Sequence, residues 1–121
     1  MPTLLLVTSA LTFGLCAIHV VAGGREVHQP MQRSDLPLDL RAFSAVLWHA
    51  VTVVLLVMAA GTAWLAVWPD SGLALVLIAI CLGWALLFVW YGQRMLGRLM
   101  PMPQWISFLV LAALIGWGTW G

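Results

Sequence analysis

Hydrophobic residues in this chain form four long runs, which polar residues interrupt only at their ends. The runs cover approximately residues 3–22, 43–68, 72–91 and 105–120. A helix needs about 20 residues, at about 1.5 Å each, to cross the roughly 30 Å hydrocarbon core of a bilayer. The runs are continuously apolar, whereas the strands of a membrane barrel alternate apolar and polar residues. We therefore predict four transmembrane helices, with a polar loop over residues 23–42 between the first two.

Composition agrees with this prediction. Of the 121 residues, 64% are hydrophobic and 7% are charged, whereas a soluble domain has roughly 45–50% and roughly 25%. So few charges exclude a soluble enzyme, a nucleic-acid binder and a secreted disulfide scaffold. We predict a single integral membrane domain over residues 1–121, an all-α transmembrane four-helix bundle surrounded by lipid.

All basic residues fall on one predicted side of the membrane. The segments 23–42 and 92–104 hold Arg25, Arg33, Arg41, Arg94 and Arg98, and the opposite side holds no Arg or Lys. Basic residues resist translocation, so the arginine-bearing side is expected to be cytoplasmic. This predicts both termini outside, in a multi-pass protein of the bacterial inner membrane.

Tryptophans mark the same boundaries. Trp48, Trp90 and Trp105 lie near the predicted cytoplasmic ends of the helices, and Trp68, Trp117 and Trp120 lie near the opposite ends. Indole rings prefer the headgroup level of a membrane. We therefore interpret these six residues as interfacial.

Two histidines are expected at the same depth in the membrane. His19 lies near the end of the first run and His49 near the start of the second, so antiparallel neighbouring helices would hold them at one level. Ionisable residues within a span are functional hypotheses by default. One interpretation is a cofactor site in which His19 and His49 ligate a b-type haem or bind a quinone.

Two other interpretations stay open at this stage. Cys16 and His19 share a helical face and, with His49, His28 or Glu26, would supply ligands for a metal ion. Alternatively, the imidazoles are structural and bond a neighbouring backbone, a headgroup or the Arg25–Glu26 pair.

The polar loop carries its own signals. The pair Gly23-Gly24 is expected to end the first helix with a positive φ. Ser34 or Asp35 is a suitable N-cap, so the second helix is expected to begin near Leu36. Positive and negative charges balance across the loop, which favours a docking surface for a partner. The residues predicted to take part are Arg25, Glu26 and His28.

Missing features narrow the function further. All four carboxylates lie in predicted loops, whereas a proton-coupled exporter of the small multidrug-resistance type needs an acidic residue within a span. Neither a Ser/His/Asp set, a phosphate-binding Gly-rich loop nor a zinc-protease helix motif occurs. We therefore predict that the chain is not an enzyme.

One layout of residues resembles a known group of proteins. The first predicted helix ends with His19 followed by Gly23, Gly24, Arg25 and Glu26, and the second begins with Trp48-His49. This layout resembles uncharacterised families of small bacterial four-helix integral membrane proteins. The resemblance implies the fold and a membrane location, and no activity.

The leading functional hypothesis is an accessory or assembly subunit of a larger respiratory or photosynthetic membrane complex, with other membrane subunits as partners. The alternative is a haem- or quinone-binding protein that uses His19 and His49. A small channel or transporter is the third hypothesis.

Overall fold

The computed structural model describes residues 1–121 and contains helices but no strands. Helix α1 (Pro2–Ile18) continues through the π-helical segment η1 (His19–His28) into the short α2 (Gln29–Gln32). Helices α3 (Leu38–Val67) and α4 (Ser71–Tyr91) follow, η2 (Gly92–Leu96) extends α4, and α5 (Gln104–Trp120) completes the order. The stretches Pro2–Gln32, Leu38–Val67 and Ser71–Leu96 are each long and apolar enough to cross a membrane, and α5 is shorter.

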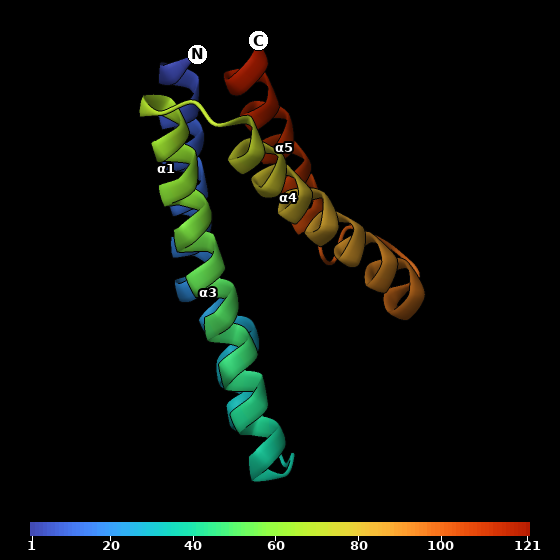
Figure 1. Cartoon of the computed structure of the whole chain (residues 1–121). Coiled ribbons are helices and arrows are strands. Elements are labelled where there is room, and N and C mark those ends of the chain that lie inside the picture. Colours follow the sequence, from blue (N-terminus) through green and yellow to red (C-terminus); the bar gives the residue numbers. More distant parts are fainter.

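The helices are arranged as two pairs. Helix α1 lies along α3, and α4 lies along α5 (Figure 1). The pairs meet through contacts of α1 with α5 and of α3 with α4. They converge at the end of the molecule that carries both termini and the α3–α4 link, and they diverge towards the other end (Figure 1).

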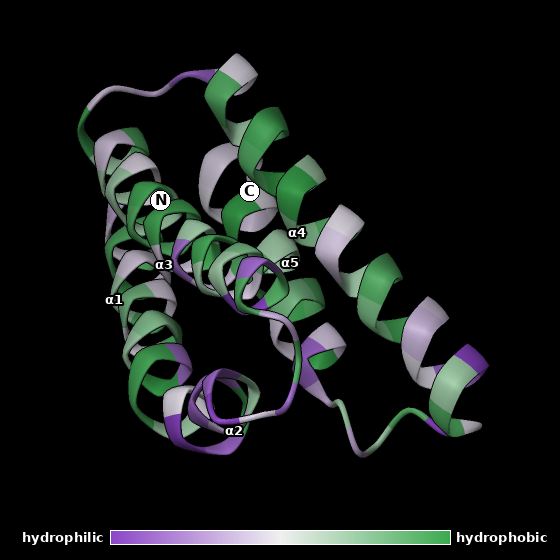
Figure 2. Cartoon of the chain, turned by 90° about the horizontal axis from the view of Figure 1, so that it is seen from below, coloured by the Kyte–Doolittle hydropathy of each residue, from purple (hydrophilic) through white to green (hydrophobic).

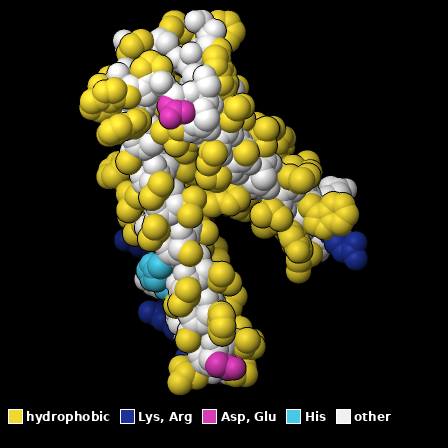
Figure 3. All heavy atoms as spheres, viewed as in Figure 1, with side chains coloured by type: hydrophobic (Ala, Val, Ile, Leu, Met, Phe, Trp, Pro, Cys, Tyr) yellow, Lys and Arg dark blue, Asp and Glu magenta, His cyan; other side chains and the backbone are white.

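The core lies where the pairs converge. Each of the four helices contributes buried residues, which are Leu5, Thr8, Thr12 and Cys16 of α1; Leu55, Met58, Ala59, Thr62 and Leu65 of α3; Ala74, Leu77, Cys81 and Ala85 of α4; and Phe108, Leu111, Ala112, Ile115 and Gly118 of α5. Beyond this region, each pair has only its own helix–helix interface. Most large apolar side chains are therefore exposed, and they cover both helix pairs, α1 with α3 and α4 with α5, which form the two arms of the molecule (Figure 3).

The three buried threonines of the core all have hydrogen-bonded hydroxyl groups. The hydroxyl groups of Thr8, Thr12 and Thr62 each donate to the backbone oxygen four residues earlier, at 2.7–2.8 Å. Ser9 Oγ instead reaches across to the Ala59 oxygen at 2.7 Å and ties α1 to α3. Hydrogen bonds of this kind allow hydroxyl side chains to lie in apolar surroundings.

Two helix ends lie at residues that suit them, one at a capping carboxylate and one at a glycine. Asp70 caps α4, because its carboxylate accepts from the Leu73 amide at 3.0 Å. Gly97 ends η2 with φ +67°, a conformation that glycine adopts without a Cβ penalty. The bounds of α4 and α5 lie within one residue of the predicted ranges 72–91 and 105–120.

The predicted loop over residues 23–42 is wrong. The chain stays helical to Gln32 and is helical again from Leu38, so only residues 33–37 connect the two long helices. Gly23 and Gly24 do not end a helix, since neither has a positive φ. They lie inside η1, where Gly23 faces the Trp48 ring of α3.

The predicted cap of the second helix is also wrong. The helix begins at Leu38 rather than near Leu36, and Pro37 occupies the N-cap position. Ser34 Oγ donates backwards to the Met31 oxygen at 2.6 Å. Arg41 stabilises the link over residues 33–37 instead. Its guanidinium donates to the backbone oxygen of Leu36 at 3.1 Å and to that of Gln32 at 3.0 Å.

Close packing between α1 and α5 predicts the effect of one substitution. A Cβ at Gly118 would lie 2.8 Å from Leu5 Cδ2, and Leu5 is buried. We expect Gly118→Ala to lower the free energy of unfolding in detergent micelles by about 1–3 kcal/mol, because the core is overpacked. Gly83→Ala is the matched control, since nothing lies within 4 Å of its new Cβ. Equal effects of the two substitutions would contradict this packing.

Candidate functional site

Four aromatic rings gather where η1 crosses α3. His19 and His28 are the first and last residues of η1, and Trp48 and His49 are neighbours on α3. The Trp48 ring lies between the two histidines. Its centroid is 4.1 Å from that of His19, with 20° between the ring planes, and 5.6 Å from that of His28, with 12° between the planes. We call these four residues the His–Trp cluster.

The π-helical backbone is what brings His19 and His28 to the same face. They are nine positions apart, about two and a half turns of an α-helix at 3.6 residues per turn, which would place them on opposite faces. A π-helix bonds each residue to the fifth one along and has about 4.4 residues per turn, so nine positions are about two turns. The bond from the Gln29 amide to the Gly24 oxygen shows this five-residue spacing.

Gly23 gives the indole the room it needs. A Cβ at Gly23 would lie 2.9 Å and 3.2 Å from two carbons of the Trp48 ring. Gly23 lies between His19 and His28 along η1, about one π turn after His19. The ring therefore lies against bare backbone, with one imidazole on each side.

The three histidines differ in their hydrogen bonds. His19 Nε2 lies 3.2 Å from the Trp48 backbone oxygen, and because a carbonyl only accepts, Nε2 is the donor. His28 Nδ1 is buried and has no partner within the chain. His49 is exposed, and its ring meets that of His28 nearly edge to face, with centroids 5.2 Å apart and 73° between the planes.

This geometry bears on the candidate ligand sets. His19 and His49 lie in the same cluster, but the ring of His49 contacts His28, and the ring of His19 contacts Trp48. No three His, Cys, Asp or Glu side chains are grouped so that they could hold a metal ion. Cys16, one of the candidate metal ligands, donates its thiol hydrogen to the backbone oxygen of Thr52, 3.9 Å away. The role of His19 and His49 as cofactor ligands stays a prediction.

The predicted partner-binding residues lie beside the cluster, on a helix instead of a loop. Arg25 and Glu26 are exposed on η1, and His28 is half-buried against Trp48. Polar residues gather at this end of the molecule, around α2 (Figure 2). Arginine atoms are seen above and below the histidine on the same arm (Figure 3). The structure thus keeps these predicted residues together at one end of the α1–α3 pair.

Sequence reasoning missed two residues that hold this end together. Gln32 Nε2 donates to the Arg41 oxygen at 2.9 Å, while the Arg41 guanidinium donates to the Gln32 oxygen at 3.0 Å. The reciprocal pair joins α2 to α3 across the short link. No sequence motif predicts this pair of hydrogen bonds, because two polar residues nine positions apart are common in a loop.

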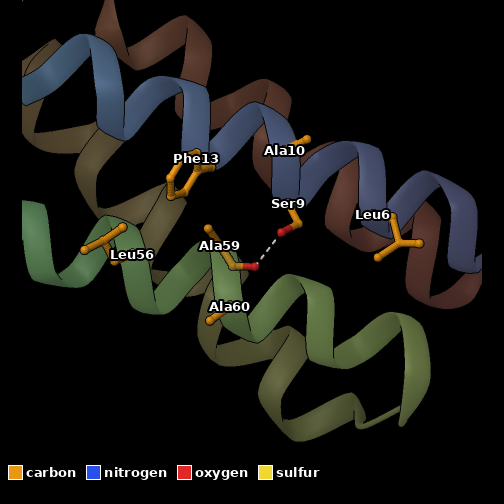
Figure 4. Close-up of a pocket in the computed structure, with 7 residues that line it drawn as sticks. All are labelled: Leu6, Ser9, Ala10, Phe13, Leu56, Ala59 and Ala60. Atoms are coloured by element: carbon orange, nitrogen blue, oxygen red, sulfur yellow. Dashed lines mark hydrogen bonds between the residues drawn. The ribbon is translucent and has the colours of Figure 1, made fainter.

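A shallow groove also lies between α1 and α3, nearer the core. It is lined by Leu6, Ser9, Ala10, Phe13, Leu56, Ala59 and Ala60 (Figure 4). Its one polar side chain, Ser9, already donates to the Ala59 oxygen (Figure 4). The groove therefore offers an apolar wall and no free side-chain group to orient a polar ligand.

Comparison of the chain with protein families, curated proteins and solved structures found no match. The resemblance to small bacterial four-helix membrane proteins accordingly stays a prediction.

Paired substitutions test the hydrogen-bond assignment within the cluster. His28→Phe keeps a ring beside Trp48 and removes an unsatisfied nitrogen, so we expect unchanged stability or a gain of up to about 1 kcal/mol. His19→Phe loses the bond to the Trp48 oxygen, and we expect a loss of about 1 kcal/mol. Unfolding of both variants in detergent micelles compares them. A larger loss for His28→Phe would show that His28 has a bonding partner in the purified protein.

Proposed function

We propose that the chain is a non-catalytic membrane protein that serves as an accessory or assembly subunit of a larger membrane complex. The observation that carries this proposal is the divergence of the two helix pairs (Figure 1). Lipid tails are as apolar as leucine, so exposed apolar side chains alone do not require a protein partner. A widening space between two apolar arms, which the space-filling view also shows (Figure 3), is different, because a partner helix lying in that space would contact both arms at once.

Helical spacing identifies side chains that face this space. A Cβ at Gly61 of α3 would lie 3.5 Å from the Leu77 side chain of α4, so these residues mark the contact between the pairs. Residues fourteen positions apart lie on the same face of a helix, because fourteen positions are close to four turns. Counted away from the core, fourteen positions from Gly61 lead to Leu47 on α3, and fourteen positions from Leu77 lead to Tyr91 on α4. Leu47 is 64% exposed and Tyr91 is 50% exposed. Both apolar arms are thus open to a partner.

We further propose the bacterial inner membrane as the location, with both termini outside the cytoplasm. The arginines support this orientation, because they all lie in the segments near the diverging ends, away from the termini (Figure 1). A respiratory or photosynthetic complex is the first partner to test.

Photo-crosslinking tests the partner proposal. A photoreactive amino acid at Leu47 should form an adduct with one defined membrane protein that also co-purifies with the unmodified chain. Val53 is the matched control. It is 58% exposed on the same helix, about 120° around the helix from Leu47, and should form mainly lipid adducts. Lipid adducts alone at Leu47, together with purification from native membranes as a lone monomer, would refute the proposal.

A second candidate function is binding of a haem or a quinone at the His–Trp cluster. The observation that favours it is the buried, unpartnered Nδ1 of His28 next to the exposed His49 ring. Imidazole nitrogens are the usual protein ligands of b-type haem and also hydrogen-bond carbonyl oxygens.

Absorption spectroscopy decides this second candidate. Protein purified from native membranes should show a Soret band or contain extractable quinone, and His49→Ala should lose most of it. Val53→Ala, an exposed change on the same helix, should retain it. Absence of both ligands from the wild-type protein would end the cofactor hypothesis while leaving the subunit proposal standing.

A further inference from the structure

The length of η1 is unusual. Most π-helical stretches are single-turn insertions in α-helices, and they are frequent at functional sites. Here the π-helix runs for ten residues, from His19 to His28. The first and last residues keep ordinary helical dihedrals, with φ −57° and ψ −48° at His19 and φ −65° and ψ −50° at His28. Conversion to an α-helix would require each amide to change its acceptor from the fifth to the fourth preceding residue. It would also turn α2 relative to α3 and break the Gln32–Arg41 hydrogen bonds.

Side-chain contacts explain why the chain adopts the π form. Stacking of His19 and His28 on Trp48 is available only when the two histidines share a face. In α-helical form His28 would turn away by about half a turn, because each residue advances about 100° instead of about 82°. Insertion of Trp48 against Gly23 and the π-helical form of η1 therefore depend on each other.

We propose that His19–His28 is a two-state segment, π-helical while Trp48 is inserted between His19 and His28 and α-helical once Trp48 leaves. With α1 fixed, the change would rotate Arg25 and Glu26 about a third of a turn around the helix axis. Both side chains are exposed, so the rotation would redirect the charged face that the sequence predicts to bind a partner. Departure of the Trp48 ring would also remove the stacking partner of His28, while His19 would keep its bond to the Trp48 backbone oxygen.

The chain offers a matched pair of glycines for the test. Gly23→Ala places a methyl group 2.9 Å from a Trp48 ring carbon, and the flanking imidazoles leave that ring little freedom to shift. Gly24→Ala, one residue away in η1, meets nothing within 4 Å. Both substitutions raise helix propensity by the same amount. A difference between the two variants therefore reports on the Trp48 contact.

Pulsed spin-label distances follow the rotation directly. Labels at Glu26→Cys and Val67→Cys join an exposed site on η1 to an exposed site at the far end of α3. The native Cys16 and Cys81 are buried, so the engineered cysteines react selectively. We expect Gly23→Ala to shift the distance by about 2–3 Å, because a sideways displacement on the order of the helix radius adds only part of its length to a distance that runs mostly along the helices, and Gly24→Ala to retain the wild-type distance. An unshifted distance in folded Gly23→Ala would overturn the proposal.

A second variant covers the case in which Gly23→Ala does not fold. Trp48→Leu removes the inserted ring without introducing a clash, and we expect the same distance shift. Fluorine NMR of protein labelled with 5-fluorotryptophan adds an independent readout, since the Trp48 signal should move in Gly23→Ala and stay in place in Gly24→Ala. A wild-type distance in Trp48→Leu would refute the two-state segment. Because these measurements follow η1 itself, they do not depend on whether the chain binds a partner.

Discussion

Backbone hydrogen bonding constrains this molecule more than any other requirement. Of its 97 backbone–backbone hydrogen bonds, 87 lie within helices. A chain with so few polar side chains has little else to satisfy its amides and carbonyls, and in lipid no water would replace the missing partners. The chain therefore changes direction only in short links. Where packing against α3 demands a different placement of side chains, the backbone changes from one helical hydrogen-bonding pattern to another instead of unwinding.

The segment η1 shows how a side chain on one helix selects the backbone form of its neighbour. Trp48 needs a flat surface without a Cβ, which Gly23 provides, and a ring on each side, which His19 and His28 provide. These three residues meet one indole only if the turns of the helix are widened. Aromatic stacking between rings contributes on the order of 1 kcal/mol per pair. Two such contacts, with the His19 hydrogen bond, give a local reason for an uncommon helix.

The sequence predicts some parts of this fold well and others poorly, for physical reasons. Ranges 72–91 and 105–120 match α4 and α5 because apolar runs there end at residues with clear local preferences, such as Asp70. The second helix begins before the apolar run over residues 43–68, because apolarity marks only the part suited to lipid, while hydrogen bonds between Arg41 and Gln32 stabilise the helix before that run. His19 could be placed near α3 from depth alone. His28 could not be placed, since α-helical periodicity puts it opposite His19. The stacking of Trp48 on both histidines could not be predicted either, because an indole near a helix end is typical of the membrane interface.

Divergence of the helix pairs has a consequence for the surrounding bilayer. Four helices packed together at one end and two separated pairs at the other give the molecule an unequal cross-section along its length (Figure 1). In a membrane, such an outline takes up more area in one leaflet than in the other. Where no partner occupies the space between the arms, lipids of the wider leaflet must fill it, and their packing depends on how cone-shaped they are. In that state the separation of the arms would depend on the lipid composition and curvature of the surrounding membrane.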